Sequence, residues 1–145
     1  MRKYIYAIMM ATVAMVLCAS ADKLVVDFTM LPQQAQTFVE TNFADKKVTT
    51  VYYNNDIFYK DYELYFSDSA KIKFEYNGEW KVIEDNKGGV PMSVVPAGVS
   101  QYVTESHPDM PIMKLERTRY GFSVELPSDI IIKFNKEELF MSYDD

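Results

Sequence analysis

Apolar and polar residues alternate along residues 62–82, and no other feature of the sequence restricts the fold as strongly. Successive side chains of a β-strand leave opposite faces of a sheet, so this alternation gathers the apolar side chains on one face. The alternation is interrupted at Ser67-Asp68-Ser69 and at Asn77-Gly78, a dipeptide that favours a tight hairpin turn. The stretch therefore predicts a three-stranded antiparallel meander, whose third strand carries Trp80 and Val82 on the apolar face.

The pattern of residues 31–84 recurs in residues 95–143, so the chain contains a tandem repeat. Pro32 corresponds to Pro96 at an offset of 64 residues, and after a turn that is four residues shorter the offset becomes 60. The matching apolar strand positions are then Tyr62 and Phe122, Leu64 and Val124, Phe66 and Leu126, Ile72 and Ile132, Phe74 and Phe134, and Trp80 and Phe140. Each repeat of about 50 residues is marginal as a separate domain, so we expect the two to share one sheet.

Each repeat begins with a short amphipathic segment. Apolar residues recur at helical spacing between Leu31 and Phe43, with Pro32 in the first turn, where no backbone donor is needed. Residues 95–103 repeat this pattern. The predicted fold is of the α+β class, with two tandem repeats of one helix and four strands. We expect one curved antiparallel sheet with both helices packed on one face, which leaves the other face open.

The N-terminal residues have the order of a secretory signal peptide. Two basic residues precede an apolar run, residues 4–18, and small residues follow at positions 19–21. The apolar run is shorter than the roughly 20 residues that span a bilayer, so no stable membrane span is expected after cleavage. We predict a signal peptide over residues 1–21, cleaved after Ala21, and a single mature domain over residues 22–145.

Cys18, the single cysteine of the chain, lies inside the predicted signal peptide. Lipid modification of Cys18 is the alternative to cleavage after Ala21, and it is disfavoured because Leu17 is bulkier than the residue that usually precedes such a site. Export predicts a periplasmic or secreted protein. Without the signal peptide the chain has no thiol, so its stability must come from packing.

The predicted mature chain is strongly acidic. Loss of the signal peptide removes two basic residues and changes the formal net charge from −6 to −8. An acidic protein of this kind is not expected to bind nucleic acid, and a basic partner surface suits it better. Ordinary solubility also explains the charge.

The sequence contains little that indicates catalysis. The one histidine, His107, follows the predicted second helix, where a structural role is expected. Two acidic pairs, Asp56 with Asp61 and Asp144 with Asp145, lack the ligand spacing of a calcium loop. No nucleophile motif or phosphate-binding loop occurs. We therefore expect no catalytic residue, no metal site and no cofactor.

Several motifs together resemble one known family. They are the signal peptide, a Leu-Pro or Val-Pro helix start, a Tyr-x-Leu or Phe-x-Val strand, and Lys-Phe-x-x-x-Gly-x-Trp at residues 73–80, arranged as a tandem repeat. From Leu31 to Tyr143 the chain resembles the PepSY-like family of exported bacterial proteins, which is related in fold to β-lactamase inhibitor proteins. The resemblance implies two α/β repeats in one curved antiparallel sheet, a periplasmic or cell-surface location in Bacteroidota, and a binding role.

The chain departs from this pattern in two respects. The inhibitor proteins are disulfide-bonded, whereas the predicted mature chain has no cysteine, so inhibition of a β-lactamase does not follow from the resemblance. The second repeat also lacks the Gly-x-Trp ending and has Glu137-Glu138-Leu139-Phe140 in its place. Its last hairpin is therefore harder to predict.

The polar face of the predicted sheet is the best lead to a function. Tyrosine and arginine are enriched among the residues that dominate binding energy at protein interfaces. The loop between Asn54 and Asp61, four residues longer than its counterpart, is a second candidate contact. The candidate binding residues on the face and the hairpin are Tyr52, Tyr59, Glu63, Tyr65, Lys73, Glu75, Arg117, Arg119, Glu125 and Lys133.

The favoured hypothesis is a non-enzymatic exported binding module that holds a protein or peptide, such as an envelope enzyme or protease, through the open sheet face. The alternative is a periplasmic sensor of a small ligand or ion. A hydrolase that uses His107 is a third hypothesis, which the absence of a nucleophile and base pair disfavours.

Overall fold

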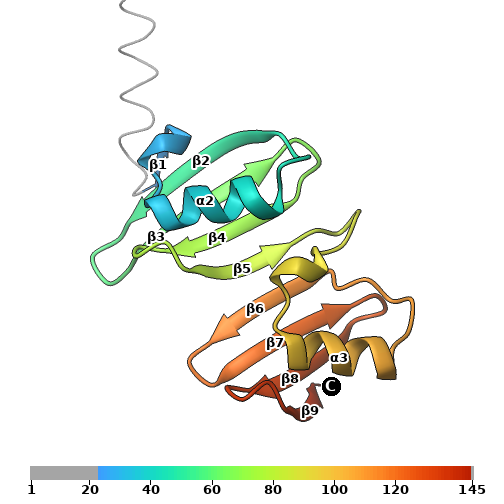
Figure 1. Cartoon of the computed structure of the whole chain (residues 1–145). Coiled ribbons are helices and arrows are strands. Elements are labelled where there is room, and N and C mark those ends of the chain that lie inside the picture. The colour runs from blue at the N-terminus through green and yellow to red at the C-terminus, as the bar shows by residue number, and fades with distance from the viewer. Residues whose placement is uncertain (1–22, 145) are drawn as a thin grey trace, which may run out of the picture.

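The computed structural model describes residues 23–144 (Figure 1). The predicted signal peptide and its cleavage site lie outside the described residues. In chain order the elements are β1 (Lys23–Val26), the 3₁₀ helix η1 (Phe28–Met30), α2 (Gln33–Asn42), β2 (Val48–Asn55), β3 (Lys60–Phe66), β4 (Lys71–Glu75), β5 (Trp80–Glu84), the 3₁₀ helix η2 (Met92–Val94), α3 (Ala97–Ser106), β6 (Lys114–Thr118), β7 (Gly121–Leu126), β8 (Ile130–Asn135) and β9 (Phe140–Asp144).

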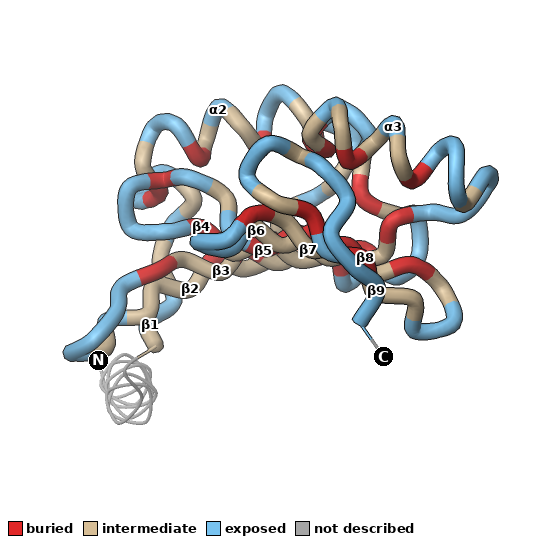
Figure 2. The backbone as a smooth tube through the Cα atoms, turned by 90° about the horizontal axis from the view of Figure 1, so that it is seen from below, coloured by how far each residue is buried: buried red, intermediate tan, exposed pale blue. Residues whose placement is uncertain are grey.

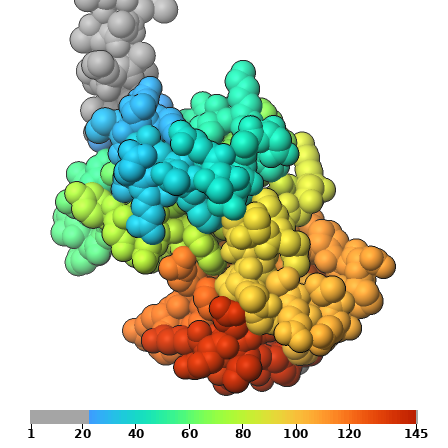
Figure 3. Space-filling view, viewed as in Figure 1, coloured from blue at the N-terminus to red at the C-terminus, as the bar shows by residue number. Residues whose placement is uncertain are grey.

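The strands form one antiparallel sheet in which each strand pairs with the next strand of the chain, in the order β1 to β9. Figure 2 shows α2 and α3 on the same side of this sheet, which bends away from the helices so that its other face is concave. From the helix side, the first repeat lies above the second and the connecting segment lies between them (Figure 3). The predicted α+β fold of two joined repeats is confirmed.

Both helices begin directly after a proline. Pro32 and Pro96 are the N-cap residues of α2 and α3, with φ of −53° and −54°. Leu31 precedes Pro32 in an extended conformation, because a residue before proline is sterically restricted from the helical region. The helix therefore starts two residues later than the hydrophobic spacing suggests, and the Leu31 side chain is buried beside it.

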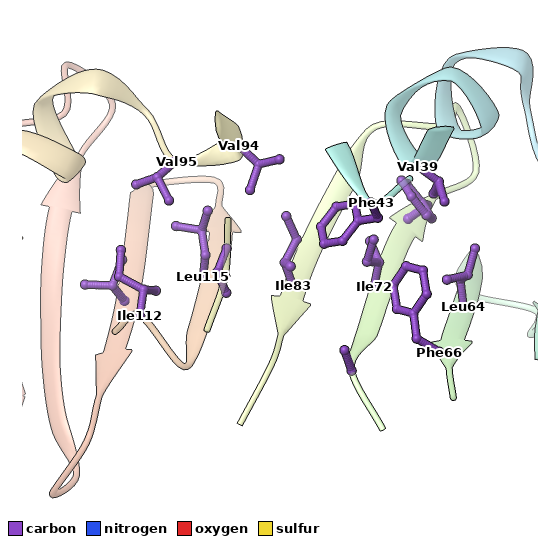
Figure 4. Close-up of a cluster of buried hydrophobic side chains, with 14 of the residues drawn as sticks. Val39, Phe43, Leu64, Phe66, Ile72, Ile83, Val94, Val95, Ile112 and Leu115 are labelled. Carbon is purple, nitrogen blue, oxygen red and sulfur yellow. The ribbon is translucent and has the colours of Figure 1, made fainter. Parts of the chain in front are cut away.

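The helices cover a single hydrophobic core that runs through both repeats. In Figure 4, Phe43 and Ile83 of the first repeat lie on one side of the join, and Leu115 and Ile112 of the second repeat lie on the other. A continuous core explains how two repeats of marginal size are stable together.

The two repeats also share their aromatic packing. The rings of Phe38 and Phe74 meet edge to face at 6.0 Å, and those of Tyr102 and Phe134 meet in the same way at 5.5 Å. These four residues occupy matching positions in the two repeats. The repeat detected in the sequence is therefore a repeat of three-dimensional packing.

A β-bulge interrupts the alternation near the end of each repeat. Phe74 pairs with Trp80 whereas Lys73 pairs with Val82, so one extra residue lies in β5, and the same shift occurs between β8 and β9. Side chains opposite each other in a ladder share a face, so Val82 lies on the same face as Lys73. The prediction that Val82 joins the apolar face is therefore wrong, and Ile83 takes that place in the core.

The N-terminal segment and the first hairpin differ from the prediction in extent. β1 adds a strand at the edge of the sheet, where Leu24 pairs with Tyr53. β2 and β3 remain paired as far as Asn55 and Lys60, so only residues 56–59 form the turn. Two of the four extra residues of this hairpin thus lengthen its strands, and the other two lie in its turn, which is longer than the counterpart at residues 119–120. The loop is therefore shorter than the predicted span from Asn54 to Asp61.

Candidate binding face

The sheet face opposite the helices, here called the open face, carries most of the candidate binding residues. The strand register places Tyr52 opposite Glu63 and Glu63 opposite Lys73. The candidates that lie on the open face are Tyr52, Glu63, Tyr65, Lys73, Glu75, Glu125 and Lys133. Their role in binding stays a prediction.

A group of paired charges occupies the first-repeat part of the open face. Glu63 is its centre, because Lys23 Nζ lies 2.7 Å from a Glu63 carboxylate oxygen and the Tyr65 hydroxyl donates to the same oxygen at 3.1 Å. Burial alone would raise the pKa of Glu63, but hydrogen bonds from Lys23, Tyr65 and Asn54 outweigh it and hold this pKa below its ordinary value. Glu63 is therefore an anion held in place by its neighbours.

Asp61 completes this group and was not among the candidates. Its carboxylate accepts a hydrogen bond from Asn54 and lies 3.4 Å from Lys73 Nζ, which is also 3.7 Å from Glu63. Asp61 is 5% exposed although it lies on the face without helices. We call Asp61, Glu63 and Lys73 the charge cluster.

The open face continues across the join between the repeats. Glu84 on β5 lies 3.3 Å from Lys71 and 3.8 Å from Lys114, so it connects strands of both repeats. Partly exposed pairs of this kind contribute at most about 1 kcal/mol each. Their charges can therefore exchange partners when another molecule approaches.

Arg117 is not on the open face, contrary to the prediction. It pairs with Phe122 in the ladder and so shares the helix-covered face with Leu115. Its guanidinium carbon lies 4.4 Å from the centre of the Trp80 ring. A long side chain can cover an aromatic ring while its charged end pairs with another group, and here Arg117 lies 3.6 Å from a Glu79 carboxylate oxygen. This explains why the alternation of polar and apolar residues misplaced it.

Replacing Arg117 with alanine is expected to lower the free energy of unfolding by about 1 kcal/mol, because the contact with the Trp80 ring is lost. Arg119→Ala is the matched control, since the Arg119 guanidinium rests only on the exposed ring of Tyr120 in the turn between β6 and β7. Urea unfolding of both variants measures the difference. Equal losses would contradict this assignment of Arg117.

Tyr59 and Arg119 lie in turns at the rim of the sheet. Tyr59 belongs to the turn of the first hairpin, residues 56–59, where Ile57 and Phe58 are 95% and 92% exposed. Three consecutive exposed apolar residues are unusual on a soluble surface, and their role in binding stays a prediction. The sequence pattern showed the length of this hairpin and not the exposure of its tip.

Comparison with known proteins gives the family of the chain. A family model described as "Putative beta-lactamase-inhibitor-like, PepSY-like" matches residues 19–64 and 60–141. The chain belongs to the PepSY-like family. The two matched segments together cover both repeats of the fold.

Crystal structures of related proteins have the same fold. A "putative calcium-regulated periplasmic protein" from Bacteroides thetaiotaomicron is 31% identical, with a TM-score of 0.83 over 86% of this chain and 98% of that chain. A "putative periplasmic protein from DUF2874 family" of Bacteroides vulgatus is 32% identical, with a TM-score of 0.80 and the same coverage. No curated protein matches the sequence.

His107 lies on the helix side of the PepSY-like sheet. It is the C-cap of α3, and its Nε2 is 2.9 Å from the hydroxyl of Tyr143. Within residues 23–144, no group of three or more histidine, cysteine or acidic side chains is placed to hold a metal ion. None of the helices described in the structure is long and apolar enough to cross a membrane.

Proposed function

We propose that this PepSY-like protein is a non-enzymatic, exported binding module that holds a protein or peptide against its open face. The observation that carries the proposal is a concave sheet face, continuous over both repeats, that no helix covers (Figure 2). A sheet face without a covering layer normally either meets water with purely polar side chains or meets a partner.

The composition of the open face favours a partner. The rings of Tyr52 and Tyr65 meet edge to face at 5.8 Å in the middle of the charged residues. Such a mixture of tyrosine and paired charges is typical of interface centres, where the aromatic groups give affinity and the charges give orientation. The exposed Ile57 and Phe58 of the first hairpin add an apolar contact at one end.

The test uses the double variant Tyr52→Ala and Tyr65→Ala as bait in envelope extracts, followed by affinity measurement with each purified partner. We expect binding to weaken about tenfold or more, because two aromatic contacts are lost. Phe58→Ser tests the contribution of the hairpin in the same assay.

The matched control is Glu40→Ala with Glu105→Ala, two exposed positions on the helices. It should leave the affinity unchanged. Urea unfolding verifies that every variant remains folded. A partner that binds the tyrosine double variant as tightly as the natural protein would show that the open face is not its site.

A periplasmic ion sensor is the second candidate, because the relative from Bacteroides thetaiotaomicron is described as calcium-regulated. Thermal unfolding with calcium chloride tests it. A ligand at 100 times its dissociation constant stabilises a folded protein by about 2.7 kcal/mol, whereas a protein-binding module without a calcium site should show no such increase.

A further inference from the structure

The two repeats differ on the open face at one pair of equivalent positions. Asp61 and Glu63 of the first repeat correspond, at the offset of 60, to Gly121 and Ser123 of the second. The ladders confirm the equivalence, since Glu63 faces Lys73 and Ser123 faces Lys133. The second repeat thus keeps the lysine of the charge cluster and lacks both of its carboxylates.

The two lysines consequently have different surroundings. Lys73 lies near two carboxylates, one of which belongs to the nearly buried Asp61. Lys133 pairs with Asp144 at 2.8 Å, and the two side chains are 48% and 51% exposed. Ion pairs exposed to this degree add little stability, so Lys133 can exchange Asp144 for another anion at small cost.

A pocket of about 510 Å³ lies beside Ser123, the position that corresponds to Glu63. Lys133 and Arg119 line it, and no acidic residue does. Its apolar lining comes from residues that include Tyr120 and Met141. This volume is within the usual range for small-molecule sites, and its charge favours an anion with an apolar part.

Gly121 has no side chain because the backbone of β8 occupies the position of a Cβ. Its φ is +146°, and a Cβ built on it would lie 2.0 Å from the carbonyl oxygen of Phe134. No other residue fits there without displacing backbone. The pairing of β7 with β8 therefore excludes an acidic side chain at the position that Asp61 occupies in the first repeat.

We propose that this pocket binds a carboxylate joined to an apolar group, with the carboxylate at Lys133 and Arg119 and the apolar group against Tyr120 and Met141. The ligand carboxylate takes the place that Asp61 and Glu63 occupy beside Lys73. The proposal rests on the proposed function, because it specifies the chemical group that one part of the open face binds. The carboxylate belongs either to an acidic side chain of a peptide or to a chain end.

The first experiment compares N-acetylphenylalanine with its amide, which lacks the carboxylate. Both are titrated into ¹⁵N-labelled protein and followed by NMR. We expect the acid to shift the amide signals of Ser123, Lys133 and Ser142, and to bind about tenfold or more tightly than the amide. Equal binding of the two compounds, or shifts confined to other parts of the sheet, would overturn the proposal.

The second experiment restores a carboxylate in the pocket. In Ser123→Glu the new side chain faces Lys133 as Glu63 faces Lys73. We expect it to pair with Lys133 and weaken binding of N-acetylphenylalanine about tenfold or more. Lys133→Gln should weaken binding to a similar degree. Lys73→Gln is the matched control, and its effect should be negligible.

These variants also distinguish failure of the pocket proposal from failure of the proposed function. If Ser123→Glu and Lys133→Gln are folded, as their NMR spectra show, and still bind the acid normally, the pocket proposal is wrong. Capture of a partner that depends on Tyr52 and Tyr65 would remain valid in that case. The source of the carboxylate follows from comparing N-acetylphenylalanine with the amidated dipeptide N-acetyl-Glu-Phe: tighter binding of either supports the proposal and identifies a chain end or a side chain.

Discussion

Replacement of Gly121 by alanine is expected to lower the free energy of unfolding by about 3 kcal/mol or more. Gly121 begins β7 and pairs with Thr118 on one side and Asn135 on the other. A Cβ at this position would lie 2.0 Å from the Phe134 carbonyl oxygen and 2.5 Å from the Asn135 carbonyl carbon. Both neighbours are backbone atoms of the adjacent strand, so the clash is relieved only by moving β8 away.

Gly88→Ala is the matched control for this substitution. Its φ is not in the positive region, and the nearest atom to a new Cβ is an Asp85 carboxylate oxygen at 3.5 Å, which is an ordinary contact. We expect a change within about 1 kcal/mol, since backbone strain is absent. Urea unfolding of both variants provides the comparison, and a similar loss in the two would contradict the role assigned to Gly121.

Replacement of Asp85 by alanine is the second large effect, with an expected loss of about 3 kcal/mol. Asp85 is 1% exposed. Its carboxylate lies 2.8 Å from Lys46 Nζ and accepts hydrogen bonds from the backbone N–H groups of Lys87 at 3.0 Å and Gly88 at 2.8 Å. Removing it leaves the N–H groups of Lys87 and Gly88 without their acceptor and leaves the mostly buried Lys46 ammonium with only the more exposed Asp68. This loss costs more than the pair itself contributes.

Asp68→Ala is the control for Asp85, because Asp68 pairs with the same Lys46 from a side chain that is 36% exposed. Water replaces much of this interaction, so the expected loss is about 1 kcal/mol or less. Urea unfolding at neutral pH measures both values. Equal losses would show that the burial of Asp85 has no special effect.

The Asp85 contacts also predict a dependence of stability on pH. Burial opposes ionisation of this carboxyl, but the hydrogen bonds from Lys46, Gly88 and Lys87 outweigh burial and lower its pKa. The folded pKa is then below the unfolded value of about 3.9, so the unfolded state binds more protons between the two. This contribution is complete above the unfolded pKa and is lost as the pH falls through the folded pKa.

Asp85→Asn tests this sign, since the amide cannot ionise. The difference in unfolding free energy between the natural protein and Asp85→Asn should be largest near neutral pH. It should decrease as the pH falls below about 4, where the aspartate of the natural protein is protonated. A difference that stays constant down to pH values near 2 would contradict the lowered pKa of Asp85.

The limits of the sequence prediction are set by β-bulges and by long side chains. Alternation placed Glu63, Lys73 and Lys133 on the correct face, because the period of a strand is two wherever the ladder is regular. Val82 follows a bulge, whose extra residue moves the next side chain to the opposite face of the sheet. No residue type marks this bulge in the sequence. Arg117 was placed on the wrong face for a different reason. Its charge suggested a position on the open face, whereas its register puts it on the same face as Leu115.

The sequence predicted which face of the sheet carries the candidate residues, but not which of these residues contact one another. The binding role of the open face and the identity of its partner stay predictions. The importance of Asp61 was hidden because the sequence placed the start of this strand at Tyr62, whereas β3 begins at Lys60 and includes Asp61. Its burial arises from Asn54 and Lys73, which come from two different strands.

The order of residues by itself determined the α+β class, the two repeats and the apolar side of the sheet, because these depend on local periods and on a constant offset along the chain. Only the tertiary structure decided which charges meet, since a contact between strands depends on register, and a single extra residue changes it. The pocket beside Lys133 belongs to this second group: its lining comes from β7, β8, β9, the turn before β7 and the end of β6, and a hollow between strands has no period to be recognised in the sequence.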